Sequence, residues 1–467
     1  MRAAPLTLGR MAAILGGALS GGAADAPVSG LQHDSRLLQP GELFFAIVSP
    51  TGNGHAYLAD AAARGACAAV VSRAPEADPG LPLVRVDDTR TALLRFAAWK
   101  VAAWGGKVVG ITGSTGKTTT KEFTATLLEA KYAVFRTPGN FNNTLGIPLA
   151  LFHLDASHEV AVLEMGMSSA GEIAALCRAA PPDVAVVTNV GTVHLEHFAD
   201  QAALARAKSE IVTGMRPGGV LVYNADNPWV RGMAGEARGR RIAFGAGPDA
   251  EVRLADWTVP DGRSTAGVLE WDGARHEVAL PMLGGHFLLN LAAAVGAARA
   301  LGVGTAAILR QIGGLRPSKM RGEIRDLPGG LRVIDDTYNS NPEAMQAVLE
   351  SLARWQGRPP TIFVAGEMRE LGADSPRLHR ETGELVARLG CELLLGVQGH
   401  AAHLVEAARA AGQAARFHPD WASAWEDLRG ALRPGRLLVV KGSRGVGLER
   451  LVQAVEKHLA ENDRRPS

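Results

Sequence analysis

The sequence has few cysteines, few aromatic residues and no excess of charge of either sign. Among its 467 residues are three cysteines, and aromatic residues make up 5%. Cys67, Cys177 and Cys391 lie far apart, which excludes a disulfide framework and a closely spaced metal site. Lys and Arg number 49 against 47 Asp and Glu, a net charge of +2 that gives no argument for a nucleic-acid partner. The cysteine content favours a reducing, cytoplasmic setting.

Long apolar runs are also missing. No stretch of about 18 strongly apolar residues occurs, so we expect no membrane insertion. Residues 1–26 carry Arg2, Arg10, an apolar stretch at 11–19 and Ala24-Asp-Ala26, a pattern similar to a secretory signal. Because the stretch is rich in Gly and Ala, we interpret it as the first helix of the fold, with a signal peptide as the alternative.

The sequence does contain many short apolar runs that alternate with helical patterns. Apolar residues make up 47% and charged residues 21%, which is enough for buried cores. The alternation predicts parallel strands joined by crossover helices. The expected strands lie at 42–48, 68–71, 107–112, 160–163, 184–187, 219–223, 331–334, 361–364, 392–395 and 437–440. Residues 250–282 predict an antiparallel edge instead, and residues 288–301 predict a helix.

The length suggests about three domains at roughly 150 residues each. We therefore predict an α/β protein with a small α/β domain over 1–100 and a central domain over 101–314. The central domain has a parallel sheet and a phosphate-binding loop. A Rossmann-like α/β domain is expected over 315–467, after a turn-rich junction at 313–330.

Residues 112–120 read Thr-Gly-Ser-Thr-Gly-Lys-Thr-Thr-Thr, between an expected strand and an expected helix. Small residues let backbone N–H groups converge on phosphate oxygens, and the helix N-terminus adds positive potential. Lys117 is suited to bridge the β- and γ-phosphates, and the Thr118 hydroxyl to bind Mg²⁺. Ile111 stands where the strict pattern has glycine, and an ordinary strand-to-helix turn is the alternative. The predicted nucleotide-binding residues are Gly113, Ser114, Thr115, Gly116, Lys117, Thr118 and Thr119.

Two further polar positions follow expected strands, where ligands of α/β proteins collect. Glu164 ends the strand at 160–163, and its carboxylate is suited to hold Mg²⁺ directly or through water. A solvated carboxylate at a strand end is the alternative. His194 follows the strand at 184–187 and is a candidate ligand of a second metal ion.

Together these residues resemble the ATP-dependent Mur ligases of peptidoglycan synthesis. The motifs that carry this resemblance are the loop at 112–118, Glu164-Met-Gly-Met167, the segment 188–194 and Ala207-Lys-Ser-Glu-Ile211. Within the family, the segments 138–148, 335–342, 365–372 and 441–445 resemble those of the member that adds the final dipeptide. The Asp-Asn-Pro-Arg segment of the sister that adds the third residue is absent.

The resemblance implies an activity. The enzyme would join D-alanyl-D-alanine to UDP-N-acetylmuramoyl-tripeptide through an acyl phosphate, with ATP and Mg²⁺. This is the last cytoplasmic step of precursor synthesis, and we expect a monomer. Diaminopimelate and lysine both fit as the third peptide residue. Folylpolyglutamate synthase, which shares the loop and the amide-forming chemistry, is one alternative. A nucleotide-gated ATPase without ligation is another.

The resemblance also implies roles for individual residues. Metal ligands would be Thr118, Glu164, His194 and Lys208, the last as a carbamate. Asn290, Arg321 and Asp336 would contact ATP, and Lys117, Lys208, His194 and Arg321 would act in catalysis. The substrates would contact Ser35, Arg36, Phe45, Ala46, Asn140, Asn142, Asn143, Asn339, Asn341, Lys441 and Arg444. Phe287 departs from the family, which has an asparagine there, and so puts one polar contact near the adenine in question.

Overall fold

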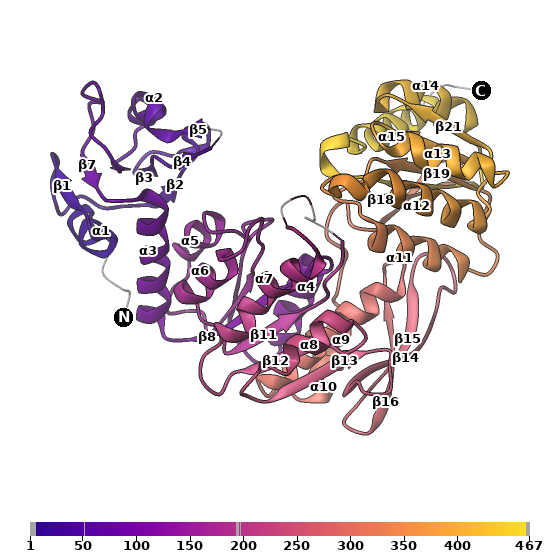
Figure 1. The fold of residues 1–467 in the computed structure, drawn as a ribbon, viewed down its shortest axis with the longest axis horizontal. Helices are drawn as coiled ribbons and strands as arrows, with labels where there is room; N and C mark the ends of the chain where they lie inside the picture. The colour runs from indigo at the N-terminus through magenta and orange to yellow at the C-terminus, as the bar shows by residue number, and fades with distance from the viewer. Residues whose placement is uncertain (1–5, 51, 193–195, 197, 464–467) are drawn as a thin grey trace.

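The computed structural model describes residues 6–50, 52–192, 196 and 198–463. Three main β-sheets follow one another along the chain, and each is covered by helices. We call them, with their helices, the N-terminal, central and C-terminal parts. They trace an open V in Figure 1, with the central part at its base and the chain ends on opposite arms. The predicted α/β class with parallel sheets is confirmed.

The N-terminal part has a five-stranded sheet in the order β1-β7-β6-β3-β2, parallel except for β1. Its strands are β1 (Ala18–Ser20), β2 (Gly30–Gln32), β3 (Glu42–Phe45), β6 (Ala68–Val71) and β7 (Leu83–Arg85), and β4 (Val48–Ser49) pairs with β5 (Gly52–Asn53) beside it. Its helices are α1 (Leu8–Leu15), η1 (Ser35–Leu37), η2 (Gly54–Tyr57) and α2 (Leu58–Ala63). Helix α1 buries Leu8, Met11 and Leu15, so the apolar stretch near the N-terminus packs in the core.

Helix α3 (Thr89–Trp104) links the N-terminal and central parts. It begins at the N-cap Asp88, whose side chain accepts a hydrogen bond from the Thr91 N–H, and it contacts α1 on one side and α5 and α6 on the other. The helix runs unbroken across residues 100 and 101, where the sequence placed a domain boundary.

The central part has a nine-stranded sheet in the order β16-β15-β14-β13-β12-β11-β8-β10-β9. Neighbours from β9 to β14 are parallel, and β14, β15 and β16 are antiparallel, which confirms the predicted edge at 250–282. The strands are β8 (Lys107–Thr112), β9 (Val134–Arg136), β10 (Val160–Glu164), β11 (Val184–Val187), β12 (Val220–Asn224), β13 (Arg241–Gly245), β14 (Val252–Thr258), β15 (Thr265–Trp271) and β16 (Ala274–Leu280). The helices are α4 (Lys117–Leu128), α5 (Gly146–Leu151), α6 (Glu172–Ala179), α7 (Gln201–Thr213), α8 (Pro228–Ala234), α9 (Gly285–Ala300) and α10 (Thr305–Ile312).

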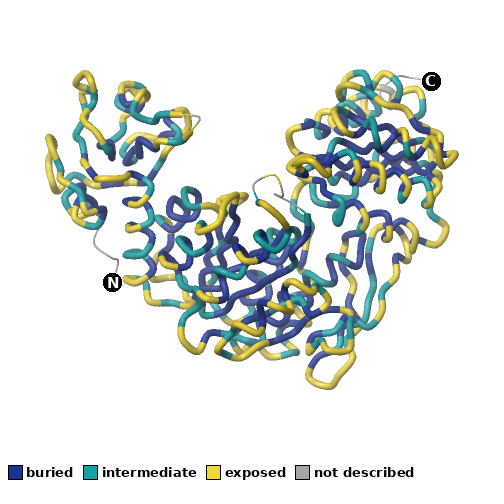
Figure 2. Tube along the Cα trace, viewed as in Figure 1, coloured by how far each residue is buried: buried dark blue, intermediate teal, exposed yellow. Residues whose placement is uncertain are grey.

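Apolar side chains fill both faces of this sheet because successive residues of a strand point to opposite sides. In β10, Val160 and Val162 join the cluster under α4 and α9, whereas Ala161 and Leu163 join the cluster under α5, α6 and α7. Figure 2 shows the central strands as buried segments between more exposed helices. The sheet is therefore packed on both faces, and the loops at the carboxyl ends of β8, β10 and β11 begin from buried strands.

The C-terminal part has a six-stranded sheet in the order β17-β18-β22-β19-β20-β21, parallel except for β17. Its strands are β17 (Glu323–Leu327), β18 (Leu331–Asp336), β19 (Thr361–Gly366), β20 (Leu393–Val397), β21 (Ala415–His418) and β22 (Leu437–Lys441). Its helices are η4 (Pro328–Gly330), α11 (Pro342–Ala353), η5 (Gly372–Asp374), α12 (Ser375–Leu389), α13 (Ala401–Ala410), α14 (Trp421–Ala431), η6 (Arg444–Val446) and α15 (Glu449–Asp463).

The three cysteines are free. Among the described residues, no helix combines the length and the apolar character that a membrane span requires.

Candidate functional site

The loop between β8 and α4 has the backbone of a phosphate-binding turn. Gly113 and Gly116 have φ angles of 149° and 79°, in the region that favours glycine. A Cβ atom at Gly113 would overlap Thr188 Oγ1, and one at Gly116 would overlap Asn290 Oδ1. Both glycines are thus required by conformation and by space, and α4 begins directly after them at Lys117.

The loop after β11 holds this turn in place. Asn189 Oδ1 accepts hydrogen bonds from the backbone nitrogens of Ser114 and Thr115 at 3.0 and 2.8 Å. Thr188 Oγ1 donates to the Thr115 carbonyl at 2.6 Å. The sequence analysis missed Asn189 as a site residue, although its place directly after an apolar strand was a usable signal.

Lys117 folds back over the turn. Its ammonium donates hydrogen bonds to the carbonyls of Gly113 and Ser114 at 2.8 and 3.2 Å. Burial lowers the pKa of Lys117, and the nearby Glu164 carboxylate partly opposes that shift. The charge therefore lies at the place where phosphate oxygens enter such a turn.

Glu164 ends β10 with its carboxylate buried. Oε1 accepts a hydrogen bond from Asn142 Nδ2 at 2.8 Å, while Oε2 finds no hydrogen-bond partner among the described residues. A buried carboxylate oxygen without a partner is costly unless a cation or a donor completes it. Glu164 thus fits the predicted magnesium ligand, and Thr118 lines the same cavity.

Lys208 lies on α7 and is 2% exposed. Burial lowers the pKa of its ammonium well below the usual value, and the nearby positive charge of Lys117 lowers it further. A lowered pKa favours the neutral amine, the form that carbamate formation requires. His194, the other predicted ligand in this region, lies outside the described residues.

A cavity of about 380 Å³ joins Lys117, Thr118 and Glu164 to residues of the C-terminal part, and Lys208 is not among its lining residues. Asp336 and Lys441 form an ion pair of 2.6 Å at its far side, and Lys441 also donates to the Asn339 carbonyl at 3.1 Å. Asn290 enters from α9 and accepts a hydrogen bond from Thr120. The cavity brings together the predicted residues Ser114, Thr115, Gly116, Lys117, Thr118, Thr119, Asn142, Glu164, Asn290, Arg321, Asp336, Asn339, Asn341 and Lys441.

Arg321 reaches the phosphate loop from the junction between the central and C-terminal parts. Its Nη2 donates to Thr118 Oγ1 at 3.1 Å, and its guanidinium lies 4.1 Å from the ring centre of Tyr338. Met320 and Gly322 on either side have φ angles of 59° and 68°, so the junction makes a tight turn here.

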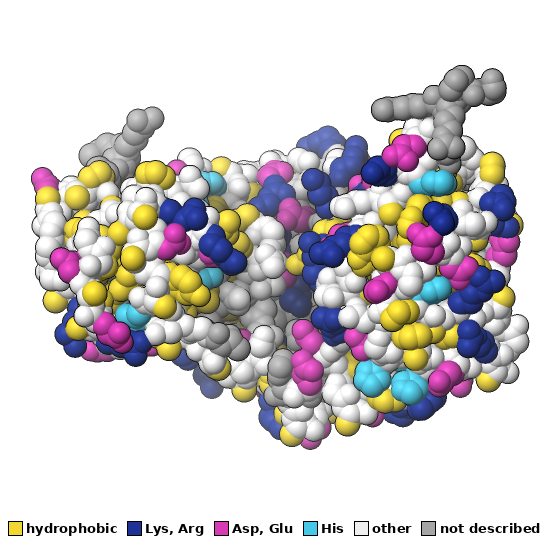
Figure 3. All heavy atoms as spheres, turned by 90° about the horizontal axis from the view of Figure 1, so that it is seen from above, with side chains coloured by type: hydrophobic (Ala, Val, Ile, Leu, Met, Phe, Trp, Pro, Cys, Tyr) yellow, Lys and Arg dark blue, Asp and Glu magenta, His cyan; other side chains and the backbone are white. Residues whose placement is uncertain are grey.

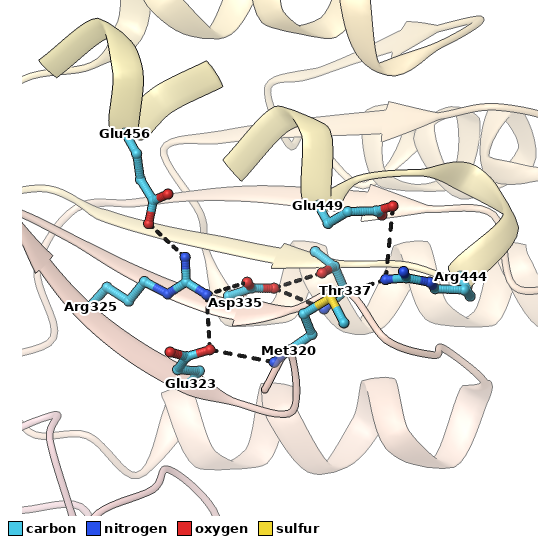
Figure 4. Close-up of polar contacts among 8 residues, drawn as sticks. All are labelled: Met320, Glu323, Arg325, Asp335, Thr337, Arg444, Glu449 and Glu456. Atoms are coloured by element: carbon cyan, nitrogen blue, oxygen red, sulfur yellow. Dashed lines mark hydrogen bonds and ion pairs between the residues drawn. The ribbon is translucent and has the colours of Figure 1, made fainter. Parts of the chain in front are cut away.

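The turn that carries Arg321 is fixed to the C-terminal part (Figure 4). Arg325 donates to Glu456, Glu323 and Asp335 at 2.6, 2.9 and 3.1 Å. Burial raises the pKa of Asp335, and hydrogen bonds from Thr337 oppose that shift. Because Glu323 and Arg325 lie directly after the turn, any movement of the C-terminal part carries Arg321 with it.

Arg444 lies on the other side of this turn. Its Nη1 donates to Met320 Sδ at 3.0 Å and lies 3.8 Å from Glu449 (Figure 4). A second cavity of about 460 Å³ beside it is lined by Arg444, Lys319 and Asn140. Figure 3 shows a hollow between the two arms of the molecule, with Lys and Arg side chains near its rim.

The residues predicted to hold UDP lie in the N-terminal part and line neither cavity. Arg36 forms an ion pair of 2.6 Å with Asp34 and is 81% exposed. Phe45 and Ala46 are buried in two apolar clusters, and Ser35 is buried too. Among these residues, Arg36 is therefore the one with an exposed side chain, and Phe45 and Ala46 offer a ligand only their backbone.

Two predicted substrate-contact asparagines have local structural roles. Asn143 Oδ1 accepts hydrogen bonds from the backbone nitrogens of Leu145 and Gly146 at 3.0 and 2.8 Å. Asn341 is the N-cap of α11, and its side chain accepts from the Ala344 N–H at 2.8 Å. Both side chains hold the backbone around the site, which their residue type alone did not reveal.

Phe287 packs under the turn that carries Arg321. Its side chain is 4% exposed, and a Cβ atom at Gly322 would lie 3.1 Å from its ring. The His286 ring centre lies 4.2 Å away. Burial lowers the pKa of His286 to about 4, so this imidazole is neutral near pH 7.

Comparison with known families and proteins gives consistent matches over the chain. Residues 111–298 match the Mur ligase middle domain, and residues 320–444 match the Mur ligase, glutamate ligase domain. The UDP-N-acetylmuramoyl-tripeptide–D-alanyl-D-alanine ligase of Bacillus subtilis is 31% identical over 91% of this chain and 93% of its own length. The Escherichia coli enzyme of the same name is 32% identical over 97% and 99%.

Solved structures agree with these relatives. MurF from Acinetobacter baumannii superimposes with a TM-score of 0.89 at 28% identity, covering 98% of this chain and 100% of its own. MurF from Thermotoga maritima, solved in complex with ADP, has a TM-score of 0.81 at 31% identity and covers 93% and 98%. Folylpolyglutamate synthase from Mycobacterium tuberculosis shares the fold, with a TM-score of 0.58 at 17% identity.

Proposed function

The chain belongs to the Mur ligase family and is an ATP-dependent ligase, and we propose that it joins D-alanyl-D-alanine to UDP-N-acetylmuramoyl-tripeptide. One observation of the structure carries the proposal. A single cavity holds a phosphate loop with Lys117, the guanidinium of Arg321 and a Glu164 carboxylate oxygen that has no hydrogen-bond partner within the described part of the chain. Lys117 and Arg321 neutralise the charge of a triphosphate and of an approaching carboxylate, and Glu164 would contribute by holding Mg²⁺.

The chemistry requires activation, because a carboxylate is a poor acylating group at neutral pH. The terminal carboxylate of the tripeptide attacks the γ-phosphorus of ATP, the bond to the bridging oxygen breaks, and ADP leaves. The amine of D-alanyl-D-alanine then attacks the acyl phosphate and loses a proton, and phosphate is expelled. Both steps depend on charge neutralisation and positioning rather than on a covalent enzyme intermediate.

We assign the charge neutralisation to Lys117, to Arg321 and to the residues that would hold Mg²⁺. Lys117 lies over the phosphate loop and withdraws negative charge from the phosphates. Arg321 reaches Thr118 from the C-terminal side and faces the same phosphates. Glu164 and Thr118 would hold Mg²⁺, which supplies further positive charge when bound. A carbamate on Lys208, together with His194, would provide a second magnesium site.

We assign the remaining binding roles to the three parts of the chain in turn. Residues 1–100 would bind the UDP end of the substrate, with Arg36 as the exposed charge. Residues 101–314 would bind ATP, with Asn290 near the adenine and Asp336 from residues 315–467 on the ribose. The incoming dipeptide would lie near Lys441 and Arg444. We expect a monomer that acts in the cytoplasm.

An assay of ADP release tests the proposal against an ATPase that performs no ligation. With ATP, Mg²⁺ and UDP-N-acetylmuramoyl-tripeptide present, sustained ADP release should depend on D-alanyl-D-alanine, and the pentapeptide product should form in equal amount. ADP release at full rate without the dipeptide would refute ligation. The same assay with a folate and glutamate tests the folylpolyglutamate alternative, for which we expect no turnover.

A further inference from the structure

A carboxylate, Glu343, lines the cavity where negative phosphates are expected. It lies in the first turn of α11, directly after the N-cap Asn341 and Pro342. Its Oε1 accepts a hydrogen bond from the Thr192 backbone nitrogen at 2.7 Å, and its Oε2 accepts from Thr192 Oγ1 at 3.1 Å. Both carboxylate oxygens thus bind one residue of the central part, across the boundary with the C-terminal part.

The fit around this contact is close. A Cβ atom at Gly191 would lie 2.8 Å from the Glu343 carboxyl carbon, so a larger residue at 191 would displace the carboxylate. The contact joins residues 151 positions apart in the sequence. The helix dipole stabilises an acidic residue in the first turn of a helix, and this effect needs no partner from another sheet. The paired hydrogen bonds and the space left by Gly191 are not explained by that effect.

The other side of this segment contacts the phosphate loop. The Gly191 backbone nitrogen donates to Ser114 Oγ at 2.9 Å. Asn227 Nδ2 and Gln201 Nε2 donate to the Val190 carbonyl at 3.0 and 3.4 Å, which fixes the preceding peptide. A continuous set of hydrogen bonds therefore runs from Glu343 through Thr192 and Gly191 to the phosphate loop.

We propose that Glu343 is a positioning residue that couples the docking of the C-terminal part to nucleotide binding at the phosphate loop. Docking places the carboxylate on Thr192, which orders the segment that contacts Ser114. By linkage, a nucleotide that favours this loop conformation favours docking by the same factor. Thr192 also stands two positions before His194 in the sequence. The inference deepens the proposed function, since docking brings the dipeptide site to the acyl phosphate.

Arg321 and Glu343 make different contributions to docking. Arg321 brings a positive charge toward the phosphates, and it sits on a turn that moves with the C-terminal part. Glu343 brings a negative charge that phosphates would repel, and the two hydrogen bonds from Thr192 stabilise this charge in the docked position. A misdocked C-terminal part would therefore expose this carboxylate to ATP. Glu343 thus favours one docked orientation over others.

A double-mutant cycle on Glu343→Ala and Thr192→Val tests this coupling. The affinity for a non-hydrolysable ATP analogue with Mg²⁺ should fall about three- to tenfold in each single variant, the range of the net contribution of a typical hydrogen bond. The double variant should lose little more than Glu343→Ala alone. Small-angle X-ray scattering monitors compaction as the analogue is added. The single variants should need correspondingly more analogue than the parent protein to become compact.

Two controls keep the result interpretable. Glu350→Ala removes an exposed acid from the same helix, where its carboxylate accepts from Gln346, and should behave as the parent protein. Glu343→Gln keeps the side-chain shape and one carbonyl oxygen, so it should bind the analogue more tightly than Glu343→Ala does. It also shows whether position 343 tolerates substitution. Melting curves identify any variant that fails to fold.

The outcomes separate this inference from the proposed ligase activity. Parent-like analogue affinity and compaction in Glu343→Ala, or fully additive effects in the double variant, would overturn the coupling even if ligation is confirmed. If the parent protein shows no turnover with D-alanyl-D-alanine but the cycle is non-additive, the coupling holds and the substrate proposal fails. The analogue binds without either substrate, so the two results are independent.

Discussion

The cavity between the central and C-terminal parts and the surface of the N-terminal part differ in how their predicted residues are held. At the cavity, Lys117 and Glu164 are hydrogen-bonded within the central part, and Lys441 is paired with Asp336 within the C-terminal part. In the N-terminal part, Arg36 is exposed and pairs with Asp34, its neighbour two positions earlier in the chain. Charges held in a cavity act on a ligand more strongly than an exposed pair in water. We therefore expect substitutions at the cavity to have larger effects than those at the UDP surface.

The largest effect should come from Lys117→Ala. The variant should fold, because the side chain serves the phosphate loop rather than an apolar core, and it should lose on the order of 10²-fold or more in kcat. Turnover and a melting curve check both statements. Lys457→Ala removes an exposed lysine of α15 and serves as the control. Near-normal turnover of Lys117→Ala with a parent-like melting temperature would mean that the cavity does not bind the transferring phosphate.

A second large effect is expected at Lys208. Carbamylation would convert its amine into an anion with two oxygen ligands for Mg²⁺. Lys208→Ala should lower kcat at least about tenfold, because even an outer-sphere partner of a metal site contributes that much. Added short-chain carboxylic acids should restore part of the activity.

Arg206→Ala, an exposed change on the same helix, is the matched control for Lys208→Ala. Loss without chemical rescue would favour direct pairing of the Lys208 ammonium with phosphate. Full activity would show that the buried lysine has no catalytic role.

The same comparison explains which features were predictable from sequence. The strands were predictable because apolar runs of parallel sheets are buried on both faces. The phosphate loop was predictable because Gly113 and Gly116 satisfy backbone requirements that few other residues meet. Asn189 follows an apolar strand, which marked its region, but its bond to Ser114, 75 positions away, was not predictable, and neither was the contact of Glu343 with Thr192, 151 positions away. Local patterns carry no information about such distant partners.

Residue type was least informative where a side chain serves the backbone. Asn341 stands in a motif that suggested substrate contact, but its side chain caps α11. Phe45 belongs to an expected strand, and the strand turns this side chain into the core. In both cases the resemblance predicted a contact with substrate, whereas packing and capping decide what the side chain does in the structure.

A moderate effect should follow from Arg36→Ala in the N-terminal part. A hydrogen bond from Arg36 lowers the pKa of Asp34 to about 2, so both groups are charged at neutral pH. Because the arginine is exposed, its loss should raise KM for the UDP substrate about three- to tenfold and leave KM for ATP unchanged.

The control for Arg36→Ala is Arg377→Ala, an exposed arginine paired with acids in the C-terminal part. It should change neither KM. A hundredfold loss in Arg36→Ala would contradict the expected difference between the two regions, and an unchanged KM would remove Arg36 from the UDP site.

The smallest effect on activity is expected from Phe287→Asn. The ring packs under the turn that carries Arg321, and the substitution restores the residue that the family resemblance expects near the adenine. Affinity for ATP should therefore change by less than about tenfold, or 1.4 kcal/mol, while the melting temperature falls because apolar contact in a buried site is lost. Isothermal titration with an ATP analogue and a melting curve separate the two quantities, and Phe287→Leu, which keeps apolar contact, is the control. A lower melting temperature with unchanged ATP affinity would show that Phe287 contributes to packing alone. The position of Arg321 at the nucleotide site would then not depend on the Phe287 ring.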